Sequence, residues 1–303
     1  MFADRQHTRA FLLLGLVMLL WAGNAIVARA VRGDVGPFTL AFVRWAGASL
    51  VLLPFAVAPL RRDWPAIVRG WKAIVLLGLL GIAAFNALLY SGLKYTPATN
   101  ALLLQASIPP AVMLADRVLF GARSTWGQAL GVLASVAGVV VIVFRGDPAS
   151  ALRLHFGLGD ALVLCAVAVW ALYTVLLRLR PPISPVSFIA TTFFIGVLAM
   201  APLSVWEWHA GHGPVWSPQL VGAFVYVALL PSLLSYFIYN HAAGVVGPAR
   251  AGQAITMMPL FGAFLSAALL GETLHPFHFA GMALILLGII VAALAGRGVQ
   301  THT

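Results

Sequence analysis

The sequence predicts an all-α polytopic membrane protein in which ten transmembrane helices form two inverted five-helix repeats. Three observations support this prediction. Hydrophobic residues occupy 62% of the 303 positions and charged residues only 9%, whereas a soluble domain is about a quarter charged. The few charges leave uncharged intervals close to the ~20 residues that a helix needs to cross a bilayer. Similar residues also recur at a nearly constant offset in the two halves of the chain.

The uncharged intervals place the expected spans in order along the chain. Eight intervals are bounded by charged residues: Arg9–Arg29, Lys72–Lys94, Lys94–Asp116, Arg123–Arg145, Asp160–Arg178, Arg180–Glu207, Arg250–Glu272 and Glu272–Arg297. The stretch from Asp34 to Arg61 holds another span, broken only by Arg44, and the stretch 208–249 holds a loop and one more. The runs are continuously apolar rather than alternating, which indicates helices and not a β-barrel. We expect helices at 10–30, 37–58, 73–93, 97–116, 125–144, 159–179, 184–205, 218–240, 248–270 and 276–296.

The recurrence along the chain indicates two copies of one unit. Matching residues lie 148 to 151 positions apart: Trp21 and Trp170, Pro37 and Pro185, Pro54 and Pro202, Thr96 and Gly247, Gly131 and Gly281, and Gly138 and Gly288. The expected units are residues 1–147 and 148–303. Because each unit contains an odd number of spans, the second enters the membrane inverted, an arrangement typical of secondary transporters. The glycine pairs predict that the fifth and tenth spans are packing helices.

The net charge of +10 indicates orientation in a membrane rather than binding to nucleic acid. With the N-terminus inside, twelve Lys and Arg residues fall in inner segments and five in outer ones, so both termini are expected in the cytoplasm. We expect a multi-pass protein of the bacterial inner membrane. The first span is too long for a cleaved signal peptide, and the single cysteine, Cys165, excludes an internal disulfide.

Three motifs resemble a known transporter family. They are WAGNAIVAR at 21–29, Pro37 followed by Arg44, and LLGETLHPFHFAGMALILLGIIV at 269–291. With the expected ten spans, the chain is similar over nearly its whole length to the EamA-type branch of the drug/metabolite transporter superfamily, and within it to bacterial exporters of aromatic and other amino acids. The resemblance implies a carrier of small metabolites, with a central cavity between the first, third, fourth, sixth, eighth and ninth spans. One departure is that the LGE motif ending at Glu272 reads Phe-Gly-Ala at 120–122 in the first half.

Polar and aromatic residues share helix faces on these six spans. Asn86 and Tyr90 are four residues apart, and Ser232 shares a stripe with two tyrosines. Because unpaired polar groups are costly in lipid, these residues either line a wet cavity or join helices by hydrogen bonds. Neutral hydrogen-bonding groups with aromatic walls suit a small zwitterion or a ring-bearing solute. The substrate-binding candidates are Trp21, Asn24, Asn86, Tyr90, Gln105, Trp170, Tyr173, Tyr236, Tyr239, Gln253 and Thr256.

Arg44 is the one charge well inside a span, where burial costs on the order of several kcal/mol. It either draws a substrate carboxylate, caps carbonyl groups between helices, or extends outward to the membrane surface. Pro109 and Pro110 in the fourth span, and Pro259 in the ninth, are hinge candidates, because each removes a backbone hydrogen bond. The alternative is a static kink that shapes the cavity.

Acidic, nucleophilic and metal-binding side chains limit the classes of function that this chain can have. No Asp or Glu falls in the middle of a span, which disfavours the export of cations in exchange for protons. The spans hold no nucleophile–base pair, and HAGH at 209–212 and HPFH at 275–278 fall in short outer loops without further metal ligands, so we expect no catalytic residue, metal or cofactor.

We therefore expect a secondary transporter that exports amino acids, aromatic ones included, by alternating access. The alternatives are an exporter of drugs or other metabolites and, more remotely, a channel or an intramembrane enzyme. The expected partners are a small-molecule substrate and the lipid bilayer, not nucleic acid, and we expect a functional monomer.

Overall fold

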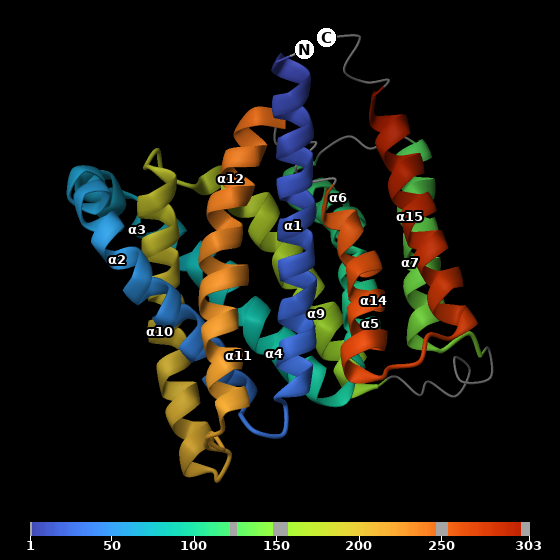
Figure 1. Cartoon of the computed structure of the whole chain (residues 1–303). Coiled ribbons are helices and arrows are strands. Elements are labelled where there is room, and N and C mark those ends of the chain that lie inside the picture. The colour runs from blue at the N-terminus through green and yellow to red at the C-terminus, as the bar shows by residue number, and fades with distance from the viewer. Residues whose placement is uncertain (1, 122–125, 148–156, 247–253, 298–303) are drawn as a thin grey trace.

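The computed structural model describes residues 2–121, 126–147, 157–246 and 254–297, and all regular secondary structure in these ranges is helical. The first half contains α1 Phe2–Ala30, α2 Pro37–Arg69, α3 Trp71–Gly78, the π-helix η1 Leu79–Ala84, α4 Phe85–Tyr95, α5 Ala98–Gln105, α6 Ile108–Phe120 and α7 Trp126–Val143. The second half contains α9 Leu158–Leu176, η2 Leu177–Leu179, α10 Pro185–His209, α11 Pro218–Ala228, the π-helix η3 Leu229–Leu234, α12 Ser235–Val246, η4 Ala254–Met257, α14 Met258–Leu270 and α15 Pro276–Arg297. The helices form one bundle with both termini at the same end (Figure 1).

Several of these helices can cross a membrane. Within the described residues, six helical segments are long and apolar enough, and a seventh if α5 and α6 form one span. Each of the ten expected ranges overlaps a described helix, but the apolar parts of α7, α14 and α15 are shorter, at 10 to 17 residues. The chain is therefore a multi-pass helical membrane protein, and the number of ten spans stays a prediction.

The bundle turns apolar side chains outward as well as inward. On α2, Leu50 and Phe55 are 71% and 69% exposed, whereas Leu52 and Ala56 of the same helix are buried. A soluble protein rarely exposes such continuous apolar surface. This pattern is the one expected of a helix that faces lipid on one side and protein on the other.

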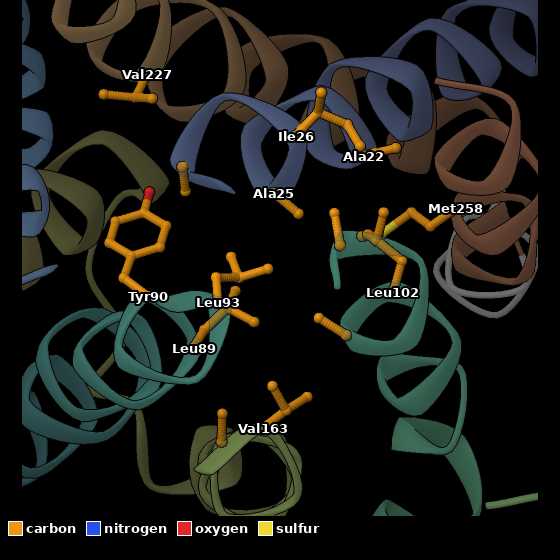
Figure 2. Packing of buried hydrophobic residues seen from close by; sticks show 14 of the residues in the cluster. Ala22, Ala25, Ile26, Leu89, Tyr90, Leu93, Leu102, Val163, Val227 and Met258 are labelled. Atoms are coloured by element: carbon orange, nitrogen blue, oxygen red, sulfur yellow. The ribbon is translucent and has the colours of Figure 1, made fainter. Parts of the chain in front are cut away.

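The core holds residues of both halves around α1. Figure 2 shows Ala22 and Ala25 of α1 facing Leu89 of α4, Leu102 of α5 and Met258 of α14. The small alanine side chains allow α1 to lie close to its neighbours, as small residues do in membrane helices.

The expected packing of the fifth and tenth spans is confirmed. Helices α7 and α15 lie side by side at one edge of the bundle (Figure 1). A Cβ atom added to Gly138 would lie 2.5 Å from the carbonyl oxygen of Gly281, and one added to Gly288 would lie 2.3 Å from that of Gly131. These glycines therefore bring the two backbones together within the chain.

Two π-helices were not predicted, and they occupy equivalent places. η1 begins at Leu79 and η3 at Leu229, 150 residues apart, which is the offset of the repeat. Near η3, Ser232 Oγ donates to the carbonyl of Val227 at 2.8 Å, and Trp21 Nε1 donates to the carbonyl of Pro231 at 2.9 Å. Side chains thus satisfy backbone groups where the α-helical ladder is interrupted, and such interruptions are frequent at functional sites.

The three candidate hinge prolines lie next to breaks between two helices, not at kinks inside a continuous helix. Helices α5 and α6 meet at an angle of 42°, with Ala106 and Ser107 between them. Pro109 and Pro110 lie in the first turn of α6, and Pro259 in the first turn of α14, where a missing N–H costs nothing. These prolines therefore remove no helix hydrogen bond, contrary to the expectation. Pro109 and Pro110 still lie near the middle of the possible α5–α6 span, and the role of the three prolines as hinges stays a prediction.

Candidate functional site

A cavity of about 70 Å³ lies between helices of both halves. Its wall includes residues of α1, α2, α4, α5 and α6 from the first half, and of α9, α12 and α14 from the second. One enclosed water needs roughly 10–15 Å³ of such space, so the cavity has room for several waters. It is the natural place to look for a solute, because its wall joins polar groups to aromatic surface.

Aromatic rings form much of the wall: Trp21, Trp45, Phe85, Trp170 and Tyr236. The ring centroids of Phe85 and Trp170 are 4.6 Å apart, and Tyr236 meets Trp21 edge to face at 6.2 Å. Rings that pack on each other in this way present rigid apolar faces to a ligand.

Arg44 is the charged group of this site. It is only 6% exposed and lines the cavity from α2. Its Nε donates to Ser232 Oγ at 2.6 Å, and its Nη1 donates to Asn86 Oδ1 at 3.0 Å and to the Tyr90 hydroxyl at 2.8 Å. The guanidinium carbon lies 4.4 Å from the ring centroid of Trp45. Arg44 is therefore held in one place by α4, η3 and its own neighbour.

The hydrogen bonds continue from Arg44 to α1. The hydroxyl of Tyr90 donates to Asn24 Oδ1 at 2.8 Å, and Asn86 Nδ2 donates to the carbonyl of Ile82 at 2.9 Å. Asn24, Asn86 and Tyr90 are all buried. Each of these three side chains thus makes at least one hydrogen bond inside the protein, as buried polar groups require.

Arg44 has no carboxylate partner within the described residues. The ion pairs found there join Arg29 to Glu272, Arg62 to Asp63 and Arg178 to Asp116. The cavity wall contains no Asp or Glu among its described residues, and no hydrogen bond joins Arg44 Nη2 to another described residue. The site therefore combines an unpaired positive charge with neutral polar and aromatic groups.

The structure places the sequence-predicted residues in three groups. Six of the eleven line the cavity: Trp21, Asn24, Asn86, Gln105, Trp170 and Tyr236. Three lie behind the wall: Tyr90 bonds Arg44, Tyr173 packs on Trp170 at 5.1 Å between ring centroids, and Tyr239 packs on Trp21 at 5.5 Å. Gln253 lies outside the described residues, and Thr256 belongs to the helix η4 but its side chain is not described.

Sequence reasoning missed several apolar wall residues, among them Trp45, Phe85, Ile108 and Met258. In a chain so rich in apolar residues, nothing distinguishes a cavity-facing side chain from a lipid-facing one. The interpretation that Arg44 extends outward to the membrane surface is wrong, because it is buried beside the cavity and bonds side chains of two other elements. The sequence singled out Arg44 as a candidate because it is a charged residue inside an apolar span.

Two glutamates link helices of the two halves at the end of the bundle opposite the termini. At this end α1 connects to α2, α10 to α11 and α14 to α15 (Figure 1). Glu207 Oε2 accepts from the N–H of Thr39, at the start of α2, and from its hydroxyl, both at 2.8 Å. Glu272 Oε2 accepts from the N–H and the hydroxyl of Thr99, at the start of α5, at 3.0 and 2.8 Å. Each glutamate ends a helix of the second half and caps a helix of the first. Glu207 is thus a buried capping group, 3% exposed.

The histidines at this end are also placed differently from the expectation. His278 lies in the first turn of α15, not in a loop, and is buried. Its Nδ1 accepts from the N–H of His275 at 3.0 Å, and its Nε2 lies 2.9 Å from Asn100 Oδ1. These bonds fix the ring as a link between α15 and α5. Within the described residues, no group of three or more His, Cys, Asp or Glu side chains could hold a metal ion.

Several curated proteins similar to this chain are named as transporters or exporters. An uncharacterized transporter of Archaeoglobus fulgidus is 29% identical over 94% of this chain and 97% of its own length. The uncharacterized transporter YyaM of Bacillus subtilis is 24% identical, over 95% and 94%. A protein of Streptantibioticus cattleyicolor named "Probable terminal-alkyne amino-acid exporter" is 28% identical, over 94% and 93%.

A solved structure shows the same fold. It is described only as the crystal structure of a protein, and it matches with a TM-score of 0.59 at 22% identity, over 96% of this chain and 99% of its own.

A family model matches the chain twice. The EamA-like transporter family model covers residues 8–144 and again 157–294. The two matches show that the chain consists of two related units, and the family is one of transporters, not of enzymes. With the helical membrane fold and relatives named as transporters over almost their whole length, they establish that this chain belongs to the EamA-like transporter family.

Proposed function

We propose that the protein is a secondary transporter that exports amino acids, aromatic ones included, across the bacterial inner membrane. The observation that carries this proposal is the buried Arg44, which has no acidic partner among the described residues, in a cavity with aromatic walls. An amino acid supplies a carboxylate for the guanidinium and, when aromatic, a ring for the wall. The relative named as an amino-acid exporter supports the proposal at 28% identity. Export of a cationic drug is the weaker alternative, because no described wall residue is acidic.

The architecture proposed for this function is ten spans in two inverted halves, residues 1–147 and 148–303. Three observations support it: the family model matches each half, π-helices recur 150 residues apart, and each end-capping glutamate of the second half meets a helix start of the first. Both termini lie at one end of the bundle (Figure 1), as an even number of crossings requires. We place that end in the cytoplasm, and we propose that the monomer is the functional unit.

The proposed mechanism is alternating access. The solute binds between the two halves, which then rock so that the cavity opens to one side and afterwards to the other. Regular α-helix is interrupted between α5 and α6, which meet at 42°, and at the change from η4 to α14. Pro109, Pro110 and Pro259 lie in the first turns of the helices that follow. We propose these prolines as the hinge residues.

Transport assays in proteoliposomes test the proposal. Vesicles with purified protein are loaded with a panel of labelled amino acids, and efflux and exchange are compared with protein-free vesicles. Gln105→Ala and Asn86→Ala are expected to reduce transport, whereas Gln219→Ala, at the exposed start of α11, is the control. If no amino acid leaves or exchanges above the protein-free level, the proposed substrate class is wrong.

A further inference from the structure

The cavity offers unequal partners to the two charged groups of an amino acid. This step rests on the proposed function and concerns the same site. Arg44 supplies a full positive charge for a carboxylate. For an ammonium group, the described part of the wall supplies only neutral oxygen atoms, such as those of Asn24 and Gln105. A carboxylate on Arg44 forms an ion pair as well as hydrogen bonds, whereas an ammonium group meets no opposite charge in the described wall, so the carboxylate contributes more to binding than the amino group.

The geometry around Arg44 favours binding of an anion. Nε and Nη1 are occupied by Ser232, Asn86 and Tyr90, while Nη2 makes no hydrogen bond to a described residue. The guanidinium carbon lies 4.4 Å from the ring centroid of Trp45, so the group cannot turn away without losing this contact. The side chain is thus fixed before a ligand arrives, which lowers the entropy cost of binding.

Because Arg44 is buried, the lack of a counter-charge among the described residues raises the free energy of its charged form. Arg44 is 6% exposed, and its three protein partners are neutral. A bound carboxylate would neutralise the guanidinium inside a site of low dielectric constant, where ionic interactions are stronger than in water. An amine without a carboxylate would instead add a second positive charge beside the first, and like charges at close range repel.

A second buried donor lies next to Arg44. Trp45 is 1% exposed and belongs to the cavity wall, and its indole Nε1 has no hydrogen-bond partner among the described residues. A buried donor without a partner carries a desolvation cost, and this nitrogen is enclosed by protein rather than open to the cavity. The polar groups around Arg44 are thus neutral, and none of the described ones balances its charge.

We propose that this site selects its solute by the carboxylate and not by the amino group. The carboxylate binds the guanidinium of Arg44. The ring of the solute lies among Trp21, Phe85, Trp170 and Tyr236 once these side chains have moved apart, because a cavity of about 70 Å³ is smaller than a phenyl ring needs. The substrate class is then aromatic carboxylates: aromatic amino acids and their deaminated analogues alike. Aromatic amines that lack a carboxylate are excluded.

Competition on the wild-type protein tests this selection directly. Proteoliposomes that exchange labelled phenylalanine are challenged with unlabelled phenylalanine, 3-phenylpropanoate, which lacks the amino group, and phenethylamine, which lacks the carboxylate. We expect 3-phenylpropanoate to inhibit nearly as well as phenylalanine and phenethylamine to inhibit at least about tenfold more weakly, as loss of one charge-assisted hydrogen bond implies. Equal inhibition by phenethylamine would overturn the proposal.

Variants of Arg44 assign the selection to this side chain. Arg44→Gln removes the charge, so any remaining transport should no longer distinguish 3-phenylpropanoate from phenethylamine. Arg44→Lys keeps a charge without the planar fork and should retain the order of the three ligands with weaker inhibition. Arg61→Gln, exposed on the same helix, is the matched control. Melting temperatures in detergent show which variants fold, and the wild-type competition decides the proposal if Arg44→Gln does not.

The outcomes separate this inference from the proposed function. If phenylalanine is transported but phenethylamine competes equally, the selection by carboxylate is wrong and the proposed function stands. If labelled 3-phenylpropanoate is transported and no amino acid of the panel is, the amino-acid assignment is wrong, and of this inference only the requirement for a carboxylate holds. If neither 3-phenylpropanoate nor any amino acid is transported, both are wrong.

Discussion

Tyr90 connects three helices through one hydroxyl group. It accepts a hydrogen bond from Arg44 of α2 and donates one to Asn24 of α1, at 2.8 Å in each case. Its ring is buried in the core between α1 and α4 (Figure 2). The residue thus fixes the position of the guanidinium relative to the cavity, although it does not line the cavity itself.

Tyr90→Phe removes this connection while keeping the ring. The carbonyl oxygen of Asn24 then loses its donor, and a buried group left unpaired costs about 1–3 kcal/mol. We expect a lower melting temperature in detergent and weaker transport. Tyr95→Phe is the control, because Tyr95 is 61% exposed. An equal change of melting temperature in the two variants would contradict this role of Tyr90.

Gly81 is the second residue on which the shape of the cavity depends. It lies in η1 and forms part of the wall, and an added Cβ atom would lie 2.5 Å from the ring of Tyr173. Gly81→Leu must therefore displace that ring or occupy the cavity, and overpacking of this kind costs about 1–3 kcal/mol. We expect transport to be lost even where the protein still folds. Gly222→Leu, where an added Cβ meets nothing within 4 Å, should keep transport.

At the scale of elements, the two capping glutamates join the halves of the chain. Glu207→Gln and Glu272→Gln replace a charged cap by a neutral one, and loss of a cap costs about 0.5–2 kcal/mol. We expect both to lower the melting temperature, and Glu207→Gln to do so more, because Glu207 is buried whereas the side chain of Glu272 is 15% exposed. Asp34→Asn, in the α1–α2 connection, is the control. The prediction fails if all three variants melt alike.

The sequence predicted most helix positions and only part of the site. Uncharged intervals predict helices that cross the lipid bilayer, so the helical ranges were predictable. Paired glycines predict backbones that approach closely, so the packing of α7 on α15 was predictable as well. The π-helices were not, because residues such as Gly81 and Ser232 have no pattern that distinguishes a π-turn from an α-turn. The polar residues of the cavity wall were predictable, because polar side chains are rare in the apolar spans. Residues such as Trp45 and Met258 face the cavity only because of how the helices rotate, which depends on contacts between distant segments.

At the scale of the molecule, orientation in the membrane follows from the connections between helices. With Cys165→Ser as background, a cysteine replaces Gly33 in the α1–α2 connection, Gly213 in the α10–α11 connection, or Lys72 at the start of α3. If both termini are cytoplasmic, a membrane-impermeant maleimide added to intact cells should label the variants Gly33→Cys and Gly213→Cys. It should label Lys72→Cys only after permeabilisation. The reverse pattern would place the termini outside.

Alternating access requires the end opposite the termini to open, and there α2 and α10 are tied by a compact cluster. The Thr39 hydroxyl donates to Glu207 and accepts from Ser204 Oγ and from Trp208 Nε1, each at 3.1 Å. These two helices belong to different halves, so any motion that separates the halves at this end must break the cluster. A covalent bond at the same place should therefore stop the cycle without altering the cavity.

A disulfide between Thr39→Cys and Ser204→Cys, in the Cys165→Ser background, tests this requirement. The two hydroxyl oxygens are 3.1 Å apart, so sulfur atoms in their places reach the disulfide length of about 2.05 Å with small shifts. We expect oxidation to abolish transport in the double variant and a reductant to restore it, whereas each single cysteine variant stays insensitive to both treatments. Transport that continues in the cross-linked protein would show that this end does not open, and access would then have to change by motion of α5, α6 and α14 alone.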